Sequence, residues 1–114
     1  MNQIQNTSPD YTMELHNNNF YTFIMDFRGG TYTSQVHAES LHSSLKGWVE
    51  NLRHNMNEIE HLGAKTIQEI EEQVLPFPID EDPTLLKGLK NVWFFNVTTK
   101  KGSGHVLIVK TEKD

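Results

Sequence analysis

Two consecutive glycines lie between two strand-like stretches, and this arrangement constrains the fold more than any other feature of the sequence. The stretch FYTFIMDF before them is dense in aromatic and β-branched residues. The stretch TYTSQV after them follows the two-residue alternation of a strand. Both compositions are typical of strands, and a glycine pair between them predicts a β-hairpin. Because neighbouring side chains of a strand point to opposite faces, the length of the turn decides which residues share a face.

The turn of this hairpin is predicted to contain two residues, Gly29 and Gly30. An even-length turn pairs Phe27 with Tyr32 and gathers the apolar side chains of both strands on one face, whereas a three-residue turn mixes apolar with polar side chains. Two glycines also suit a type I′ turn, because both central residues of that turn need positive φ. We expect Arg28 at the edge of the turn, in contact with solvent or a partner.

After the first hairpin the apolar spacing becomes helical. The apolar residues from Leu41 to Ile59 fall within about 100° on a helical wheel, which predicts one long amphipathic helix that ends near Gly63. Thr66 followed by Glu69 fits a capping box, so a second, shorter helix is expected to begin there. The sequence Leu-Pro-Phe-Pro-Ile at residues 75–79 predicts an extended connector. Asp82 followed by Pro83 predicts a capped helical turn over residues 82–89.

The runs VWFFNVTT and HVLIVKT predict a second hairpin, with Lys-Lys-Gly-Ser-Gly as its turn. An odd-length loop is expected, which pairs Phe95 with Val109 and leaves Phe94, Val106 and Ile108 on the opposite face. Whether the loop has an even or an odd number of residues, both faces of this hairpin remain partly apolar. The surplus apolar surface needs cover from the connector, from a second copy or from a different protein.

The predicted order of elements is ββααββ. We therefore expect an α+β fold, in which a four-stranded antiparallel sheet made of two hairpins carries one long and one short helix on one face. Residues 19–114 are assigned to this single domain, in line with a chain of 114 residues. Residues 1–18 are rich in Asn, Gln, Ser and Thr, which predicts a flexible N-terminal segment.

Composition excludes several classes of protein. The chain has no cysteine, which excludes disulfides, thiolate nucleophiles and sulfur-ligated zinc. No apolar run approaches the roughly 20 residues of a membrane-spanning helix. The first residues also lack the basic and apolar segments of a secretory signal. We expect a cytoplasmic protein that needs no cofactor and does not contact a membrane.

Charge is unevenly distributed along the chain. Residues 1–86 carry 13 acidic and 4 basic side chains, and residues 87–114 carry 2 acidic and 6 basic ones. The overall charge of −5 disfavours nonspecific binding to nucleic acid. An alternative function nevertheless uses the basic C-terminal hairpin, where Trp93, Phe94 and Phe95 lie among lysines and could stack on a single strand. Packing of these aromatic residues in a core is the favoured interpretation.

Six histidines make a metal site the first catalytic hypothesis to consider. Glu50, His54, Glu58 and His61 are spaced to form one row on a continuous helix, and His54, Glu58 and His61 are the weak metal-ligand candidates. The same wheel places this row opposite the apolar stripe, so a solvated face is the favoured interpretation. No nucleophile elbow or phosphate-binding loop is present. A hydrolase with a site of scattered histidines and carboxylates is the second alternative.

Residues 20–52 combine a predicted strand, a glycine turn, a second strand and then Ala38-Glu39-Ser40 at the start of a helix, and they make up less than a third of the chain. This arrangement resembles the start of HicB-type antitoxins. The Pro-Gly-Cys-like stretch that precedes the helix in that family is absent here, and no residue role is transferred from it.

The favoured function is non-enzymatic binding of another protein. The chain would act as an immunity-type or antitoxin-like inhibitor of a heterologous partner, or as a homodimeric accessory protein. The positive indication is the apolar surplus on the second hairpin, because exposed apolar patches often mark an interface. The candidate interface residues are Trp93, Phe94, Phe95, Val106, Ile108, Lys100, Lys101 and Arg28.

Overall fold

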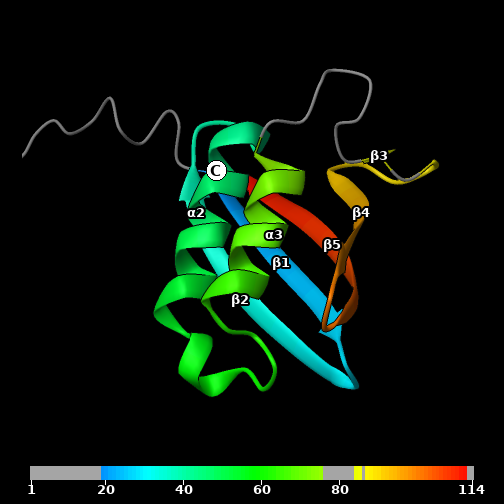
Figure 1. Ribbon diagram of the computed structural model, residues 1–114. Helices are drawn as coiled ribbons and strands as arrows, with labels where there is room; N and C mark the ends of the chain where they lie inside the picture. Colours follow the sequence, from blue (N-terminus) through cyan, green and yellow to red (C-terminus); the bar gives the residue numbers. More distant parts are fainter. Residues whose placement is uncertain (1–18, 76–83, 86, 113–114) are drawn as a thin grey trace, which may run out of the picture.

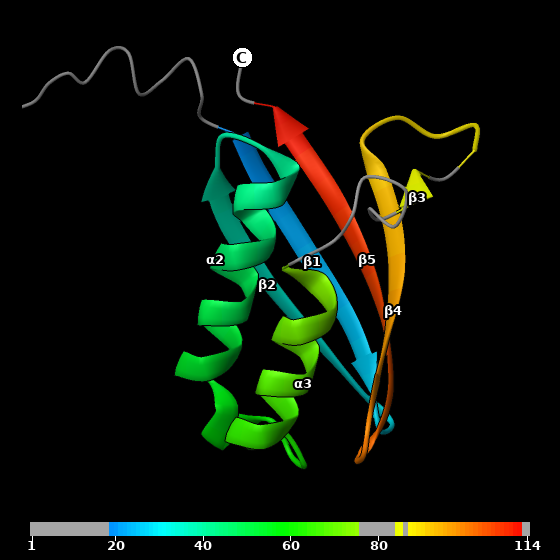
Figure 2. The ribbon, with the colours of Figure 1, turned by 45° about the horizontal axis from the view of Figure 1, so that its top comes forward.

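The computed structural model describes residues 19–75, 84–85 and 87–112, and these form an antiparallel sheet with two helices on one face (Figures 1 and 2). The predicted α+β class and the ββααββ order of the long elements are confirmed. The elements are β1 (Asn19–Phe27), β2 (Gly30–Ala38), α2 (Leu41–His54), the 3-10 turn η2 (Met56–Glu58), α3 (Ala64–Val74), β3 (Thr84–Leu85), β4 (Val92–Thr99) and β5 (Gly102–Glu112). The predictions for residues 1–18 and for the connector after Leu75 concern residues outside the described ranges.

The strand order in the sheet is β2-β1-β5-β4-β3. The two hairpins therefore meet through β1 and β5, which pair from Asn19 opposite Glu112 to Phe27 opposite Gly104. The two-residue strand β3 pairs with β4 and adds a short fifth strand to the four that were predicted. The helical turn predicted for residues 82–89 is wrong for Thr84 and Leu85, because their backbone pairs with β4 instead.

The first hairpin has a two-residue turn, but the turn residues are Arg28 and Gly29, one position earlier than predicted. Phe27 pairs with Gly30, and φ is 49° at Arg28 and 83° at Gly29. A Cβ at Gly30 would lie 2.5 Å from the Tyr32 hydroxyl oxygen, so a larger residue at position 30 would require the Tyr32 side chain to move. The turn length is still even, so the predicted sorting of side chains between the faces is retained.

The second hairpin also has a two-residue turn, formed by Lys100 and Lys101, so the predicted odd-length loop is wrong. Thr99 pairs with Gly102 at the base of the turn. The Thr99 hydroxyl donates a hydrogen bond to the carbonyl of Gly102 (2.8 Å) and accepts one from the backbone N–H of Lys101 (3.1 Å). Gly102 has a φ of 141°, which glycine adopts without strain. These contacts close the two-residue turn, and Gly102, Ser103 and Gly104 are part of β5.

The even turn reverses the expected faces of the second hairpin. Phe95 pairs with Val106, and Ile108 lies on the same face two residues along β5. This face packs against the helices, and we call it the inner face. Phe94 and Leu107 pair with each other on the opposite, outer face. The predicted separation of Phe95 from Val106 is therefore wrong.

Helix α2 is shorter than its apolar pattern predicted. It begins after a capping box in which Ser40 and Ser43 exchange side-chain-to-backbone hydrogen bonds, both 3.1 Å long. It ends at His54, because the side chain of Asn55 returns to donate to the carbonyl of Asn51 (3.0 Å) and the chain continues as η2.

Helix α3 begins two residues before the predicted capping box. Gly63 is the N-cap and makes no side-chain hydrogen bond, and Thr66 is buried inside the helix. The predicted box of Thr66 with Glu69 is therefore wrong. The predicted apolar side of the helix is confirmed, because Ile67, Ile70 and Val74 are all buried.

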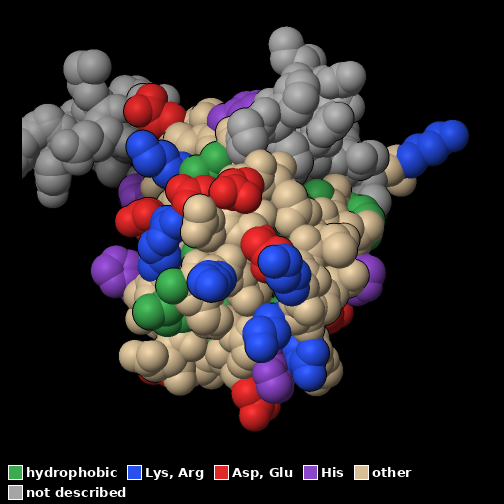
Figure 3. Space-filling model, viewed as in Figure 1, with side chains coloured by type: hydrophobic (Ala, Val, Ile, Leu, Met, Phe, Trp, Pro, Cys, Tyr) green, Lys and Arg blue, Asp and Glu red, His purple; other side chains and the backbone are tan. Residues whose placement is uncertain are grey.

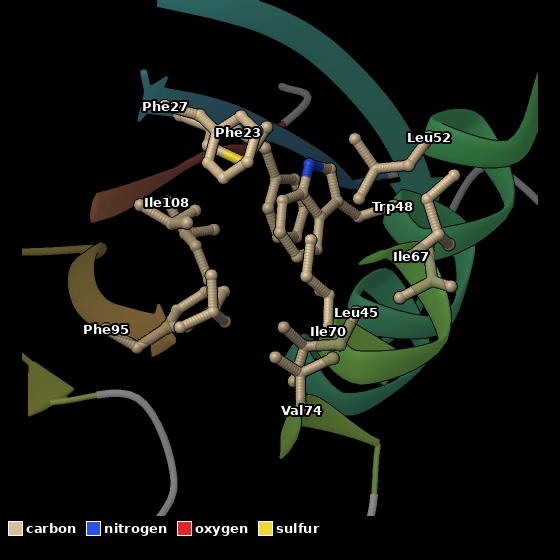
Figure 4. Packing of buried hydrophobic residues seen from close by; sticks show 14 of the residues in the cluster. Phe23, Phe27, Leu45, Trp48, Leu52, Ile67, Ile70, Val74, Phe95 and Ile108 are labelled. Atoms are coloured by element: carbon tan, nitrogen blue, oxygen red, sulfur yellow. The ribbon is translucent and has the colours of Figure 1, made fainter. Parts of the chain in front are cut away.

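Trp48 of α2 lies at the centre of the core between the inner face and the helices (Figure 4). Its ring stacks on Phe23 with centroids 5.1 Å apart and meets Phe95 edge-on at 5.7 Å. The helices are also joined at the surface, where Arg53 pairs with Glu71. This hydrogen bond is the main cause of a raised pKa for Arg53.

No helix within the described ranges has the length and apolar character required to cross a lipid bilayer.

Candidate functional site

Apolar side chains cross the outer face of the sheet, which neither helix covers (Figure 2). Ile24, Leu107 and Phe94 lie directly opposite one another on three neighbouring strands, β1, β5 and β4. Val109 and Val92 form a second, adjacent pair on the same face. Leu107 is 37% exposed, and the other four side chains are half-buried. We call these five residues the outer apolar band.

Polar pairs border the outer apolar band. Towards the turns, Thr31 donates to the carboxylate of Asp26 (2.6 Å), and His105 Nδ1 lies 2.5 Å from Asn96 Oδ1. Towards the other end, Gln35 Nε2 donates to the Thr22 hydroxyl (3.0 Å). An apolar centre within a polar rim is the usual anatomy of a protein interface.

The structure divides the predicted interface residues between the two faces. Phe95 is 7% exposed, and Val106 and Ile108 are fully buried in the core, so none of the three can meet a partner of the folded domain. Their assignment to an interface is therefore corrected. The second turn has an even number of residues, which places all three side chains on the inner face. Phe94 is on the outer face, whereas Trp93 is half-buried at the inner face, with its ring 6.4 Å from that of Tyr21.

The predicted basic residues are brought together where the two hairpin turns meet. Arg28 Nη1 donates a hydrogen bond to the carbonyl of Lys101 (2.5 Å), and the stem of Arg28 lies against Gly102. The backbone N–H of Lys100 donates to Glu69 of α3 (3.3 Å). We call Arg28, Lys100 and Lys101 the basic tip. Arg28 thus holds one turn against the other while adding to the positive charge there.

The three consecutive aromatic residues of β4 do not share a surface. Trp93 and Phe95 face the helices and Phe94 faces outward. A stacking platform of all three, as the nucleic-acid hypothesis required, is therefore not formed.

The weak metal candidates do not form the expected row either. His54 ends α2, Glu58 lies in η2, and His61 adopts a φ of 67° in the loop that follows. The predicted row needed one continuous helix from Glu50 to His61. Among the residues that the structure describes, no three His, Asp or Glu side chains are grouped closely enough to hold a metal ion.

A cleft of about 410 Å³ opens between strand β2 and the end of α2. Its floor is apolar and its rim polar, with Asn51, Asn55 and Glu58 on the helix side. Four consecutive residues of β2, from Thr31 to Ser34, form the opposite wall. The floor residues are Met25, Trp48, Leu52 and Ile59. Sequence reasoning missed this cleft, because it depends on where α2 ends.

Comparison of the chain with protein-family models, with curated proteins and with solved structures finds no match.

Proposed function

We propose that this chain is a small, non-enzymatic protein-binding domain whose outer apolar band contacts a partner protein. The observation that carries the proposal is the row of Ile24, Leu107 and Phe94 across the sheet face that neither helix covers, in the part of the chain that the structure describes. An antiparallel sheet with one face on the core normally presents polar residues on the other face. Apolar residues gathered there are best explained by burial against a second molecule.

The opposite side of the molecule has a different character. On the helix side, acidic and basic side chains alternate and hydrophobic ones appear only in small separate areas (Figure 3). Interface centres are depleted in charged residues, so this side is a poor candidate. The basic tip lies at the turn end of the sheet and favours acidic residues on the partner where they meet.

Two kinds of partner fit this proposal. One is a heterologous protein that the chain inhibits in the cytoplasm, in the manner of an immunity protein or antitoxin. The other is a second copy of the chain, bound through the same face. Both require the outer apolar band to be buried in the complex, so one surface variant tests both.

Replacement of Leu107 by lysine (Leu107→Lys) tests the proposal. The change places a charge at the centre of the band without touching the core, because Leu107 is already partly exposed. Thr111→Lys is the matched control, since Thr111 is an exposed residue of the same strand and face outside the band. Sedimentation velocity reports self-association, and affinity purification from the native cell with quantitative mass spectrometry reports a heterologous partner.

We expect Leu107→Lys to abolish either the dimer or the enrichment of one specific partner, and Thr111→Lys to retain it. The proposal fails if the wild-type chain sediments as a monomer and its captured proteins are the same as those of Leu107→Lys.

A further inference from the structure

The outer edge of β2 presents unpaired backbone groups beside the cleft. In an antiparallel ladder, successive residues alternate between bonding to the neighbouring strand and pointing away from it. Phe27 and Gly30 flank the two-residue turn and bond to each other, so Gly30 and every second residue after it bond to β1. The backbone N–H and C=O groups of Thr31 and Thr33 therefore point outward, where no other described strand lies. An open sheet edge of this kind is a template for a further strand.

Helix α2 restricts how much of this edge is available. Asn51 reaches over β2 and its Nδ2 donates to the carbonyl of Gln35 (3.4 Å). The backbone of Gly47 packs on Val36, so the helix lies directly above this part of the strand. The open stretch is thus short and coincides with the residues that line the cleft. It accommodates a few residues of an extended chain and not a whole strand.

Trp48 adds a second feature to the cleft, an indole N–H that is buried beside it. Its side chain lines the cleft but is only 1% exposed. Figure 4 shows the ring nitrogen on the edge of the indole that faces away from Ile70 and Val74. No residue in the described ranges accepts a hydrogen bond from this N–H. A buried donor without an acceptor costs roughly 1–3 kcal/mol, and buried indole N–H groups usually have a partner.

The rim of the cleft adds a charge preference. Glu58 lines it, and no lysine or arginine of the described residues forms an ion pair with Glu58. A basic side chain of a ligand would supply the missing opposite charge.

We propose that this cleft binds a short extended segment of a partner protein, which adds to β2 as a strand. Backbone groups of the segment bond to those of Thr31 and Thr33, as in other cases of β-strand addition. One side chain with an oxygen acceptor enters the cleft and accepts the hydrogen bond of Trp48 Nε1. A neighbouring lysine or arginine lies against Glu58.

A second copy of this chain is a poor occupant of the cleft. Pairing of β2 with β2 of another copy would bring the two strands about 4.8 Å apart. In an antiparallel pair formed along the whole of both strands, each α2 would lie over its own β2, and the two helices would approach more closely than the roughly 8–10 Å at which helices pack. The site is separate from the outer apolar band, and either proposal can fail without the other.

Selection from a random linear heptapeptide library displayed on phage, with the full chain as target, tests the proposal. Thr33→Pro removes an outward backbone N–H and no bond to β1, a position at which an edge strand tolerates proline. His37→Pro is the matched control, because it makes the same change at the far end of the same edge. Selected peptides are then synthesised, and their dissociation constants are measured by fluorescence anisotropy.

We expect peptides that bind wild type and His37→Pro equally and Thr33→Pro at least tenfold more weakly. In ¹H–¹⁵N spectra the indole resonance of Trp48 should shift on binding, while that of Trp93 stays in place as an internal reference. Peptides that bind Thr33→Pro as tightly as wild type would overturn the proposal, as would a selection that enriches nothing. So would a dimer of the free chain that Thr33→Pro dissociates.

Circular dichroism establishes whether Thr33→Pro folds. If it does not, Glu58→Lys replaces it, because Glu58 is exposed and its substitution leaves the core intact. At least a tenfold loss of peptide affinity is then expected, and unchanged affinity would refute the proposal.

Discussion

At the scale of single residues, two glycines lie in close contact with a neighbouring side chain. Gly30 lies under Tyr32, and Gly47 lies inside α2 under Val36, where a Cβ would come within 2.5 Å of a Val36 methyl carbon. Glycine is a poor helix former, and alanine is favoured over it by about 1 kcal/mol in a helix interior. Its presence at position 47 is therefore explained by the close contact of helix and sheet.

Gly47→Ala should lower the free energy of unfolding by about 1–3 kcal/mol, because the stiff side chain of Val36 cannot move away easily. In a Val36→Ala background, which removes the obstructing methyl groups, the same change should be neutral or stabilising. Urea denaturation of the two single variants and the double variant measures this coupling. Additive effects would contradict the explanation.

At the scale of elements, the ends of the helices are set by side chains whose roles periodicity does not reveal. Met56 and Ile59 stay in phase with the apolar stripe of α2, so the pattern alone predicts a longer helix. Asn55 ends the helix by bonding back to Asn51. The position of the cleft follows from that ending, which is why the cleft could not be predicted from the sequence.

Ser40→Ala should destabilise the protein by about 1 kcal/mol, because the first turn of α2 loses its capping hydrogen bond. Ser40→Asp is the matched variant, since aspartate also caps helices well and adds a favourable charge at the N-terminus. Its stability should match that of wild type in chemical denaturation. Equal stability of the alanine and aspartate variants would show that the cap contributes nothing.

The two hairpins differ in how well the sequence predicts them. In the first, only a turn with an even number of residues separates apolar from polar side chains. The faces are therefore predicted correctly, although the turn is displaced to Arg28 and Gly29. In the second hairpin both faces are partly apolar, so the pattern does not determine whether the turn has an even or an odd number of residues. The prediction therefore placed Val106 and Ile108 in an interface and missed Leu107 and Ile24.

At the scale of the whole molecule, both described helices lie on one side of the sheet, and adjacent residues of β5 have their side chains on opposite sides. Ile108 is fully buried opposite Phe23, whereas Leu107 is 37% exposed on the outer face. The helices contribute to the burial of Ile108 but not to that of Leu107. The two positions therefore differ in environment while sharing a strand.

Ile108→Ala should reduce the free energy of unfolding by about 2–5 kcal/mol, because it leaves a cavity in the core. Leu107→Ala should change it by about 0.5 kcal/mol or less, as is usual for surface substitutions. Thermal and urea denaturation of the monomeric protein give both values. Similar losses at the two positions would mean that the outer face is covered within the chain itself.

The pairing of β1 with β5 also has a consequence for the order of folding. The first hairpin is synthesised before the helices, but its central neighbour, β5, comes last among the described strands. Until β5 emerges, β1 has one unpaired side, and the core beneath Trp48 lacks Val106 and Ile108. Contacts between such distant segments are slow to form, because a long loop must close first. The pairing of β1 with β5 therefore forms only after the two helices and β4 have been synthesised.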